Sequence, residues 1–152
     1  MPSVPLGTYD PTEQIVIFGG IQIDGYGPGS FIKASRDEEG WTFQPSNSGG
    51  GSRSRNPNKA GKLVFTLLAS SPANALLSAI AVTDELTAEG IGECLVKDRS
   101  TGDSGASCFA QNAWIIKHPD YERMKEVGEI EWTIQTDELQ VKHAGLLPVT
   151  TL

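Results

Sequence analysis

The chain has 152 residues, of which 38% are hydrophobic and 20% charged, and its formal net charge is −7. These values exclude a disordered or membrane-like chain. They predict a single domain, residues 1–152, that folds in the cytoplasm and has its own hydrophobic core. The longest uncharged apolar run, around "ALLSAIAV", is too short to span a membrane, so we expect no membrane partner. The N-terminal segment "MPSVPLGTYD" lacks the features of a secretory signal, so we expect no export.

The first third of the chain predicts short strands separated by glycine-rich turns. The segment "EQIVIFGGIQID" has apolar residues on both sides of Gly19 and Gly20, which indicates two strands with a break between them. The segments "FIKASR" at 31–36 and "WTFQPS" at 41–46 follow the turn "GYGPGS" and flank the short connection "DEEG". We therefore expect these two segments to form a hairpin with each other.

Residues 46–61, "SNSGGGSRSRNPNKAG", predict a long flexible loop, because glycine, serine, asparagine and proline dominate the segment. No acidic residue occurs between Gly40 and Thr83. The same window contains four cations, Arg53, Arg55, Lys59 and Lys62. Three interpretations stay open for this basic segment: a phosphate site, a contact with a second copy of the acidic chain, or a solvated loop.

The middle of the chain predicts a buried strand followed by the one clear helix. "KLVFTLLA" at 62–69 is almost wholly apolar. Ser71 is a suitable N-cap, and Pro72 suits the first helical position, where the missing N–H group is not needed. The apolar stripe predicts that this helix docks on a sheet and frays within 83–90. The stripe consists of Leu76, Leu77 and Ile80.

The last third predicts strands at 92–98, 106–116, 129–136 and 138–145, of which 106–116 is either one long strand or a bent pair of strands. The third of them, "EIEWTIQT", alternates most regularly. Its apolar side chains, Ile130, Trp132 and Ile134, point one way, and its polar side chains, Glu129, Glu131, Thr133 and Gln135, point the other.

The sum of the predicted elements is about eight strands and one helix. We therefore expect a mainly β fold, a β-sandwich or barrel with one flanking α-helix and a long loop. Trp41, Trp114 and Trp132 all lie in apolar strand segments, so all three are expected in the core.

Three short motifs resemble catalytic or phosphate-binding sequences but lack the required context. "GDSG" places Ser104 as it would stand in a chymotrypsin-like protease, yet no histidine precedes it to act as the base. "GYGPG" is followed by a strand-like segment rather than by a helix, and "AGK" at 60–62 has Leu63 where a magnesium-binding hydroxyl belongs. Ser104 is interpreted as one residue of a turn.

The remaining polar residue types also do not combine into an active site. Cys94 and Cys108 are expected to be free thiols, and His118 and His143 lack the spacing of metal ligands. Glu129 and Glu131 could serve glycoside chemistry, but a solvated strand face is the simpler reading. The sequence therefore predicts no catalytic residue, no metal and no cofactor, and an assembly subunit rather than an enzyme.

The chain resembles the tail tube proteins of contractile-tailed bacteriophages, which are similar in fold to the tube protein of type VI secretion. The likeness covers most of the chain, and it rests on the order of four segments rather than on any one of them. They are "GGIQIDGYGPGSFIKASRDEEGWTF" at 19–43, "SRSRNPNKAGKLVFTLLASSPANALLSAI" at 52–80, "DSGASCFAQNAWIIKHPD" at 103–120 and "EIEWTIQTDELQV" at 129–141.

The resemblance implies a structural virion protein that forms homo-hexameric rings stacked into a tail tube. The strands of neighbouring subunits would join into a continuous inner β-barrel, with the helix on the outside towards the tail sheath protein. Tube-end and baseplate proteins would be further partners, and the tape measure protein and then the genome would pass through the lumen, the DNA without specific binding. The protein would be assembled in the host cytoplasm and reside in the phage tail.

The resemblance also assigns residues to surfaces. The loop at 46–61 would reach an adjacent ring through Arg53, Arg55, Lys59 and Lys62. An acidic lumen would repel DNA phosphates, and the candidate lumen-facing acids are Glu129 and Glu131, followed by Asp37, Glu38 and Glu39. The alternatives are a terminal tube or baseplate-hub ring protein of the same fold, or a secreted β-sandwich binding module.

Overall fold

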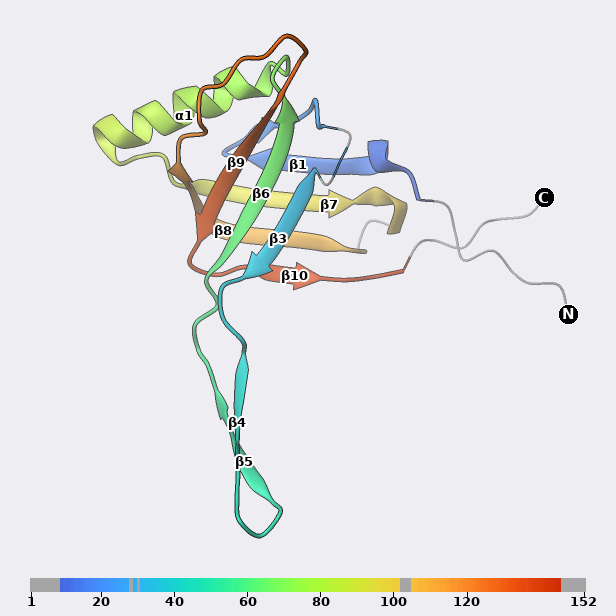
Figure 1. The fold of residues 1–152 in the computed structure, drawn as a ribbon, viewed down its shortest axis with the longest axis vertical. Helices are drawn as coiled ribbons and strands as arrows, with labels where there is room; N and C mark the ends of the chain where they lie inside the picture. The colour runs from blue at the N-terminus through green and yellow to red at the C-terminus, as the bar shows by residue number, and fades with distance from the viewer. Residues whose placement is uncertain (1–8, 28, 30, 102–104, 146–152) are drawn as a thin grey trace, which may run out of the picture.

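The computed structural model describes residues 9–27, 29, 31–101 and 105–145. Ten strands and one α-helix lie in these ranges (Figure 1). The strands are β1 (Gln14–Phe18), β2 (Ile21–Gln22), β3 (Ile32–Arg36), β4 (Trp41–Pro45), β5 (Gly51–Arg55), β6 (Gly61–Leu68), β7 (Gly92–Asp98), β8 (Ser107–Lys117), β9 (Glu129–Thr136) and β10 (Gln140–Lys142). The helix α1 is Ala73–Thr87, and short 3-10 turns cover Pro11–Glu13 and Arg99–Thr101.

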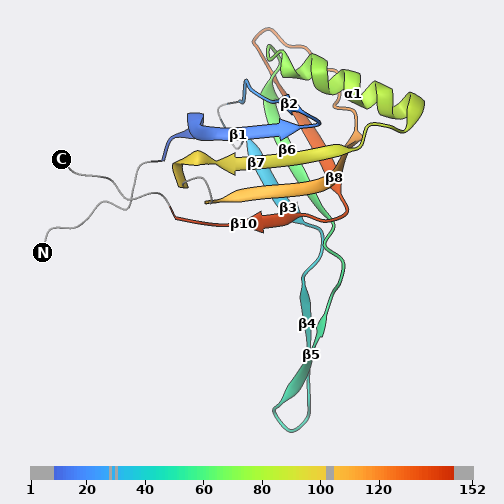
Figure 2. The same cartoon turned by 180° about the vertical axis from the view of Figure 1, so that it is seen from behind.

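The main sheet is antiparallel throughout, and it folds into two layers (Figures 1 and 2). A front layer contains β3, β6 and β9, and a back layer contains β1, β7, β8 and β10, with β2 paired to β1. The strands of the two layers cross one another in the view of Figure 1. This arrangement is a β-sandwich of the crossed kind, in which a strand connects the layers by bending.

β8 is the strand that belongs to both layers. Near its start, Cys108 lies between Val96 of β7 and Val141 of β10. Towards its end, Ile115 pairs with Ile134 of β9, and the register then shifts before Lys117. A register shift of this kind bends a strand, which lets β8 leave the back layer and join the front one.

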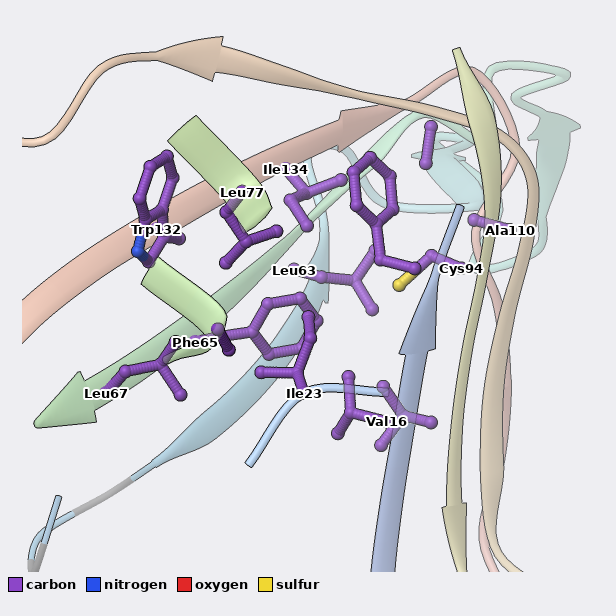
Figure 3. Close-up of a cluster of buried hydrophobic side chains, with 14 of the residues drawn as sticks. Val16, Ile23, Leu63, Phe65, Leu67, Leu77, Cys94, Ala110, Trp132 and Ile134 are labelled. Carbon is purple, nitrogen blue, oxygen red and sulfur yellow. The ribbon is translucent and has the colours of Figure 1, made fainter. Parts of the chain in front are cut away.

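The core lies between the two layers, and it follows from the alternation of β6 and β9 (Figure 3). Every second residue of β6 from Gly61 onward is buried, and the two strands pair Phe65 with Trp132 and Leu63 with Ile134. Trp132 is 2% exposed, and its indole N–H donates to Asn74 Oδ1 of α1 at 2.9 Å. The strand predicted at 129–136 and its inward-facing residues are confirmed.

The sequence predicted Ser71 as the N-cap and Pro72 as the first helical residue, but the helix begins one residue later, at Ala73. Pro72 is the N-cap itself, and Ser71 Oγ accepts a hydrogen bond from Ala73 N at 3.3 Å while donating to Asp24 O at 2.5 Å. Ser71 therefore ties the start of the helix to the segment after β2. The helix ends where Ala88 adopts the left-handed conformation, with φ 57°.

The predicted hairpin between 31–36 and 41–46 is wrong. β3 pairs with β6, where Ile32 lies opposite Phe65, and β4 pairs instead with β5. The reason is burial: β3 carries apolar side chains that pack on the core, whereas every residue of β4 and β5 is exposed. The predicted flexible loop therefore contains the strand β5, and Ser46–Gly50 forms the turn of the hairpin, closed by Ser46 N donating to Gly50 O at 2.7 Å.

Two of the three tryptophans predicted in the core lie elsewhere. Trp41 is 49% exposed on the β4–β5 hairpin. Trp114 is half-buried and lies opposite Gln135 of β9, on the side of the front layer that faces away from the core. Periodicity identified the strands but not the layer that each strand face meets.

Within the described ranges, no helix has the length and apolarity of a membrane span.

We predict that Asn74→Ala lowers the free energy of unfolding by about 1–3 kcal/mol. The side chain joins three elements, because it accepts from Trp132 and its Nδ2 donates to Leu68 O at 2.9 Å. Its loss leaves the buried indole N–H without a partner. Urea denaturation measures the change, with Ser78→Ala on the exposed side of α1 as the control. Equal stabilities of the two variants would contradict this role for Asn74.

Candidate functional site

The β4–β5 hairpin projects far from the two layers (Figures 1 and 2). Residues directly opposite in an antiparallel pair share a face, and here Trp41 pairs with Arg55 and Phe43 with Arg53. One face of the hairpin therefore carries two aromatic rings and two guanidinium groups, and the other carries Thr42, Gln44, Ser52 and Ser54. A projecting strand pair with one chemically distinct face is suited to contact another molecule.

The aromatic and cationic side chains of this face are stacked on one another. The Arg53 guanidinium lies over the Trp41 ring, 4.1 Å from its centroid. Phe43 is 68% exposed, and its ring lies against Gly51, where an added Cβ would stand 2.6 Å from the ring. A cation over an aromatic ring is stabilising, and it gains strength when a partner removes water from it.

Hydrogen bonds at the base of the hairpin hold its direction relative to the sandwich. Asn56 Nδ2 donates to Glu38 Oε2 at 2.8 Å and to Glu39 O at 3.1 Å, and Asn56 N donates to Gly40 O at 2.8 Å. The hydrogen bonds from Asn56 and then Asn58 lower the pKa of Glu38 below its ordinary value. Glu38 thus serves the base of the hairpin, a role that the sequence did not indicate.

The four predicted contact cations divide into two pairs. Arg53 and Arg55 lie on the projecting hairpin. Lys59 Nζ lies 3.8 Å from Glu138 Oε1, and Lys62 Nζ lies 4.0 Å from Asp37 Oδ1, so both lysines already have acidic neighbours within the chain. Both ion pairs are solvent-exposed and contribute little to stability. Of the four predicted contact cations, Arg53 and Arg55 are therefore the two that lie on the projecting hairpin, away from these acidic neighbours.

The predicted acids Glu129 and Glu131 are exposed on β9, on the side of the front layer that faces away from the core. Asp37 joins that side at the opposite end of β9, because Gln135 Nε2 donates to Asp37 Oδ2 at 3.2 Å. The same side also carries lysines, none of which the sequence reasoning had placed there. The β-ladder pairs identify them as Lys33, Lys62 and Lys117. Glu129 and Glu131 therefore form an acidic end of a mixed-charge face.

The main sheet ends in strands that have one strand partner each. Among the described residues, β2 pairs only with β1, β3 only with β6, and β10 only with β8. Unpaired edges expose backbone N–H and C=O groups, which favour pairing with another chain. The topology shows these edges, whereas the sequence pattern could not identify which strands would lie outermost.

Groups with catalytic potential are isolated in the described part of the chain. Burial raises the pKa of the free Cys94 thiol to about 12, so it is not a nucleophile near neutral pH, and Cys108 is a second free thiol. His118 Nε2 lies 2.9 Å from Glu85 Oε1 at an exposed position. No cluster of three His, Cys, Asp or Glu side chains in the described ranges is placed to bind a metal. Ser104 lies outside the described residues.

No family model and no curated protein sequence matches the chain. A comparison of its fold with solved structures, however, finds several proteins of one structural type. The tube-terminating cap of the anti-feeding prophage aligns with a TM-score of 0.61 at 14% identity, covering 95% of both chains. A sheath/tube terminator of the extracellular contractile injection system PVC gives 0.61 at 14%, covering 89% of this chain and 96% of the other. A chain of the PVC sheath–tube complex gives 0.61 at 12%, covering 90% and 93%. The chain therefore has a tail-tube-like fold.

We predict that Asn56→Ala loosens the hairpin without unfolding the sandwich. The variant loses the side-chain hydrogen bonds to Glu38 and to Glu39, so the Glu38 pKa rises towards its ordinary value. Backbone amides of β4 and β5 should exchange faster, while those of β6 and β9 stay unchanged. Nuclear magnetic resonance measures both quantities. Asn47→Ala, at the exposed hairpin turn, is the matched control, and an identical response in both variants would refute the assignment.

Proposed function

We propose that this protein is a structural subunit of the tube of a contractile tail or injection system, in which homo-hexameric rings stack into a hollow cylinder. The observation that carries the proposal is the projecting hairpin with its aromatic and arginine face, on a chain whose fold aligns with tube-type proteins over nearly its whole length. A side chain stack this exposed gains most when a partner covers it.

Stacking of rings is assigned to the hairpin. The hairpin, which projects from the two layers (Figure 1), would cross from one ring to the next, where Arg53 and Arg55 would meet acidic groups of a chain whose net charge is −7. Such charge pairs set register and orientation more than affinity. Lys59 and Lys62 would contribute less to stacking, because each already has an acidic neighbour within the chain, Glu138 and Asp37 respectively.

The lumen is assigned to the outward side of the front layer. In a ring, the unpaired edge of β3 would be covered by a neighbouring subunit, so that the front layers continue into an inner barrel. Glu129 and Glu131 would then form an acidic belt at one end of each ring. Repulsion between such a belt and DNA phosphates lets DNA pass without binding.

The expected partners follow from this arrangement. A sheath protein would surround the cylinder, tube-end and baseplate proteins would close it, and a tape measure protein would occupy the lumen before the genome or another cargo. The protein would reside in a phage tail or a tail-like particle. No catalytic role is assigned to it.

A tube-terminating ring is the second candidate, because two of the three solved structures named above are tube terminators. The two roles differ in self-assembly: a tube subunit polymerises, whereas a terminator stops at one ring. Electron microscopy of the purified protein separates them by the length of the particles. A secreted binding module would also use exposed aromatic rings such as Trp41 and Phe43, but it would remain monomeric.

We predict that Arg53→Glu with Arg55→Glu prevents stacking while single rings still form. The change reverses the charge that faces the acidic neighbour and removes the guanidinium from the Trp41 ring. Negative-stain microscopy should show rings in place of tubes. Ser52→Glu with Ser54→Glu adds acidic groups to the other face of the same hairpin and should leave tubes intact. Normal tubes from the arginine variant would remove the hairpin face from the interface.

We predict that Glu129→Gln with Glu131→Gln slows passage of DNA through assembled particles and increases retention of short duplex DNA by tubes at low salt. Neutralising the belt removes repulsion of the phosphates. Glu13→Gln with Glu93→Gln makes the same change of charge away from the front layer and serves as the control. Equal retention by both variants, with assembly intact, would oppose the lumen assignment.

A further inference from the structure

A groove runs beside α1, between the helix, the turn that joins β1 to β2 and the turn that precedes β7. It consists of two pockets of about 140 and 240 Å³, which share Ile80, Glu89 and Gly90. We call it the α1 groove. Its apolar lining residues are Phe18, Ile21, Leu76, Ala79, Ile80 and Ile91. All of its lining residues and their chain neighbours lie within the described ranges. A groove with this lining suits an apolar group of another molecule.

Glycines form part of the wall of the α1 groove. Gly19 has φ 60°, a conformation that favours glycine, and a Cβ added to it would stand 3.8 Å from Ile80 Cδ1. Gly90 N donates to Asp84 Oδ1 at 3.0 Å, and a side chain on Gly90 would overlap Asp84. The backbone of both turns therefore approaches α1 closely, which fixes the shape of the groove.

The larger pocket of the α1 groove is wide enough for an aromatic ring. A cavity of about 150 Å³ between aliphatic and aromatic side chains is enough to bind benzene. The larger pocket has about 240 Å³, and Leu76, one of its lining residues, is 46% exposed. Ile91, which lines the smaller pocket, is 57% exposed. A ring that covers these aliphatic side chains removes apolar surface from water, which favours binding.

The segments that line the α1 groove carry acids and no cation. All lining residues fall within 1–32 and 63–96, and neither window contains a Lys or an Arg. Glu89 lines both pockets, and within the described ranges no hydrogen bond or ion pair engages its carboxylate. Asp84 and Glu85 at the end of α1 add negative charge, although each already has a partner. The groove therefore suits a partner that combines an apolar group with a cation.

The aromatic and arginine face of the β4–β5 hairpin has this combination. It carries two aromatic rings and two guanidinium groups, and no acid occurs between Gly40 and Thr83. Arg53 covers the Trp41 ring, whereas Phe43 is 68% exposed, so Phe43 is the ring that is free to enter a pocket. Aromatic and arginine side chains are the residues that most often anchor protein interfaces in this way.

The hairpin and the α1 groove lie at opposite ends of the molecule. Figures 1 and 2 show the hairpin projecting from one end of the longest axis and α1 at the other end. The hairpin therefore points away from the groove of its own chain. A second copy displaced along this axis brings its hairpin to α1. A contact of this kind joins two different surfaces, so it is head-to-tail and repeats from copy to copy.

We propose that the aromatic and arginine face of the hairpin docks into the α1 groove of a second copy in the adjacent ring, with Phe43 in the larger pocket and a guanidinium group beside Glu89. The inference rests on the proposed function, which assigns the hairpin to stacking, and it names the surface that receives the hairpin. No lining residue of the groove belongs to β3, β6 or β9. The contact therefore leaves the edge of β3 to the neighbour within the ring and the front layer to the lumen.

Other occupants match fewer of these features. A small apolar ligand in the groove would leave the carboxylate of Glu89 without a counter-charge and the hairpin face exposed. A sheath protein over α1 would cover the groove but would leave the hairpin face exposed. A second copy supplies the ring and the cation together and covers both surfaces in one contact. Burial of the ring supplies association free energy, and the charges set the orientation.

Ala79→Arg tests the receiving surface. Ala79 is exposed on α1 and lines the larger pocket, so an arginine there occupies the pocket and repels the guanidinium groups of the hairpin. Urea denaturation should give an unchanged midpoint, because the core is untouched. Negative-stain microscopy should show single rings in place of tubes. Tubes from this variant in parental yield would overturn the inference.

Ser78→Arg is the matched control for that variant. Ser78 is also exposed on α1, and it lies two residues from both Leu76 and Ile80, which places it on the other side of the helix from the groove. This variant adds the same charge to the same helix and should form tubes like the parent chain. Loss of tubes in both variants alike would assign the effect to charge on α1 and overturn the role of the groove.

Photochemical cross-linking identifies where the hairpin docks. Phe43→benzoylphenylalanine keeps an aromatic ring at this position and forms a covalent bond to its neighbour under ultraviolet light. In tubes, mass spectrometry should locate the bond within 18–21 or 76–92 of a second copy. Thr42→benzoylphenylalanine, on the other face of the hairpin, should not label these residues.

The outcomes separate this inference from the function on which it rests. Tubes in which position 43 labels another region of a second copy, or labels none, would overturn the inference and leave the stacking of rings standing. A parent chain that forms no tubes at high concentration would overturn both.

Discussion

The antiparallel pairing of β6 with β9 is the interaction on which the rest of the molecule depends. Eight consecutive residue pairs join the two strands, from Gly61–Thr136 to Leu68–Glu129. Their inward side supplies Phe65 and Trp132 to the core, and their outward side presents the acids of β9. The same pairing fixes β6 between the hairpin before it and the helix after it, so one ladder positions both of these elements.

The hairpin stands apart from that ladder in its energetics. Every residue of β4 and β5 is exposed, so the hairpin draws no support from burial of apolar surface within the chain. An isolated two-stranded hairpin is only marginally stable in water. The bonds around Asn56 and the stack of Arg53 on Trp41 maintain its shape, and its exposed aromatic face is a surface whose burial a second copy would complete.

Several surfaces of the single chain lack a neighbour among the described residues, and they include the edge of β3, the exposed apolar residues Val82 and Leu86 of α1, and the aromatic face of the hairpin. Unpaired backbone groups and exposed apolar side chains are both unfavourable in water. Their occurrence at different ends of one chain suits a subunit with several neighbours better than a monomeric binding module. The mixed charge around Lys33, Lys62 and Lys117 also restricts the repulsive acids to one end of the front layer.

Sequence alone determined the features that depend on neighbours along the chain. The alternation of "EIEWTIQT" predicted β9 and its buried residues, and the serine and proline before Ala73 predicted the start of the helix to within one residue. The interpretation of Ser104 as a turn residue stays a prediction. Tertiary structure decided which strands pair, because 41–46 can join either of two neighbours of similar length and only burial separates them. It also decided that Trp41 lies on an exposed hairpin and that Lys59 and Lys62 face acids of their own chain, since strand periodicity specifies two faces but not what each face meets.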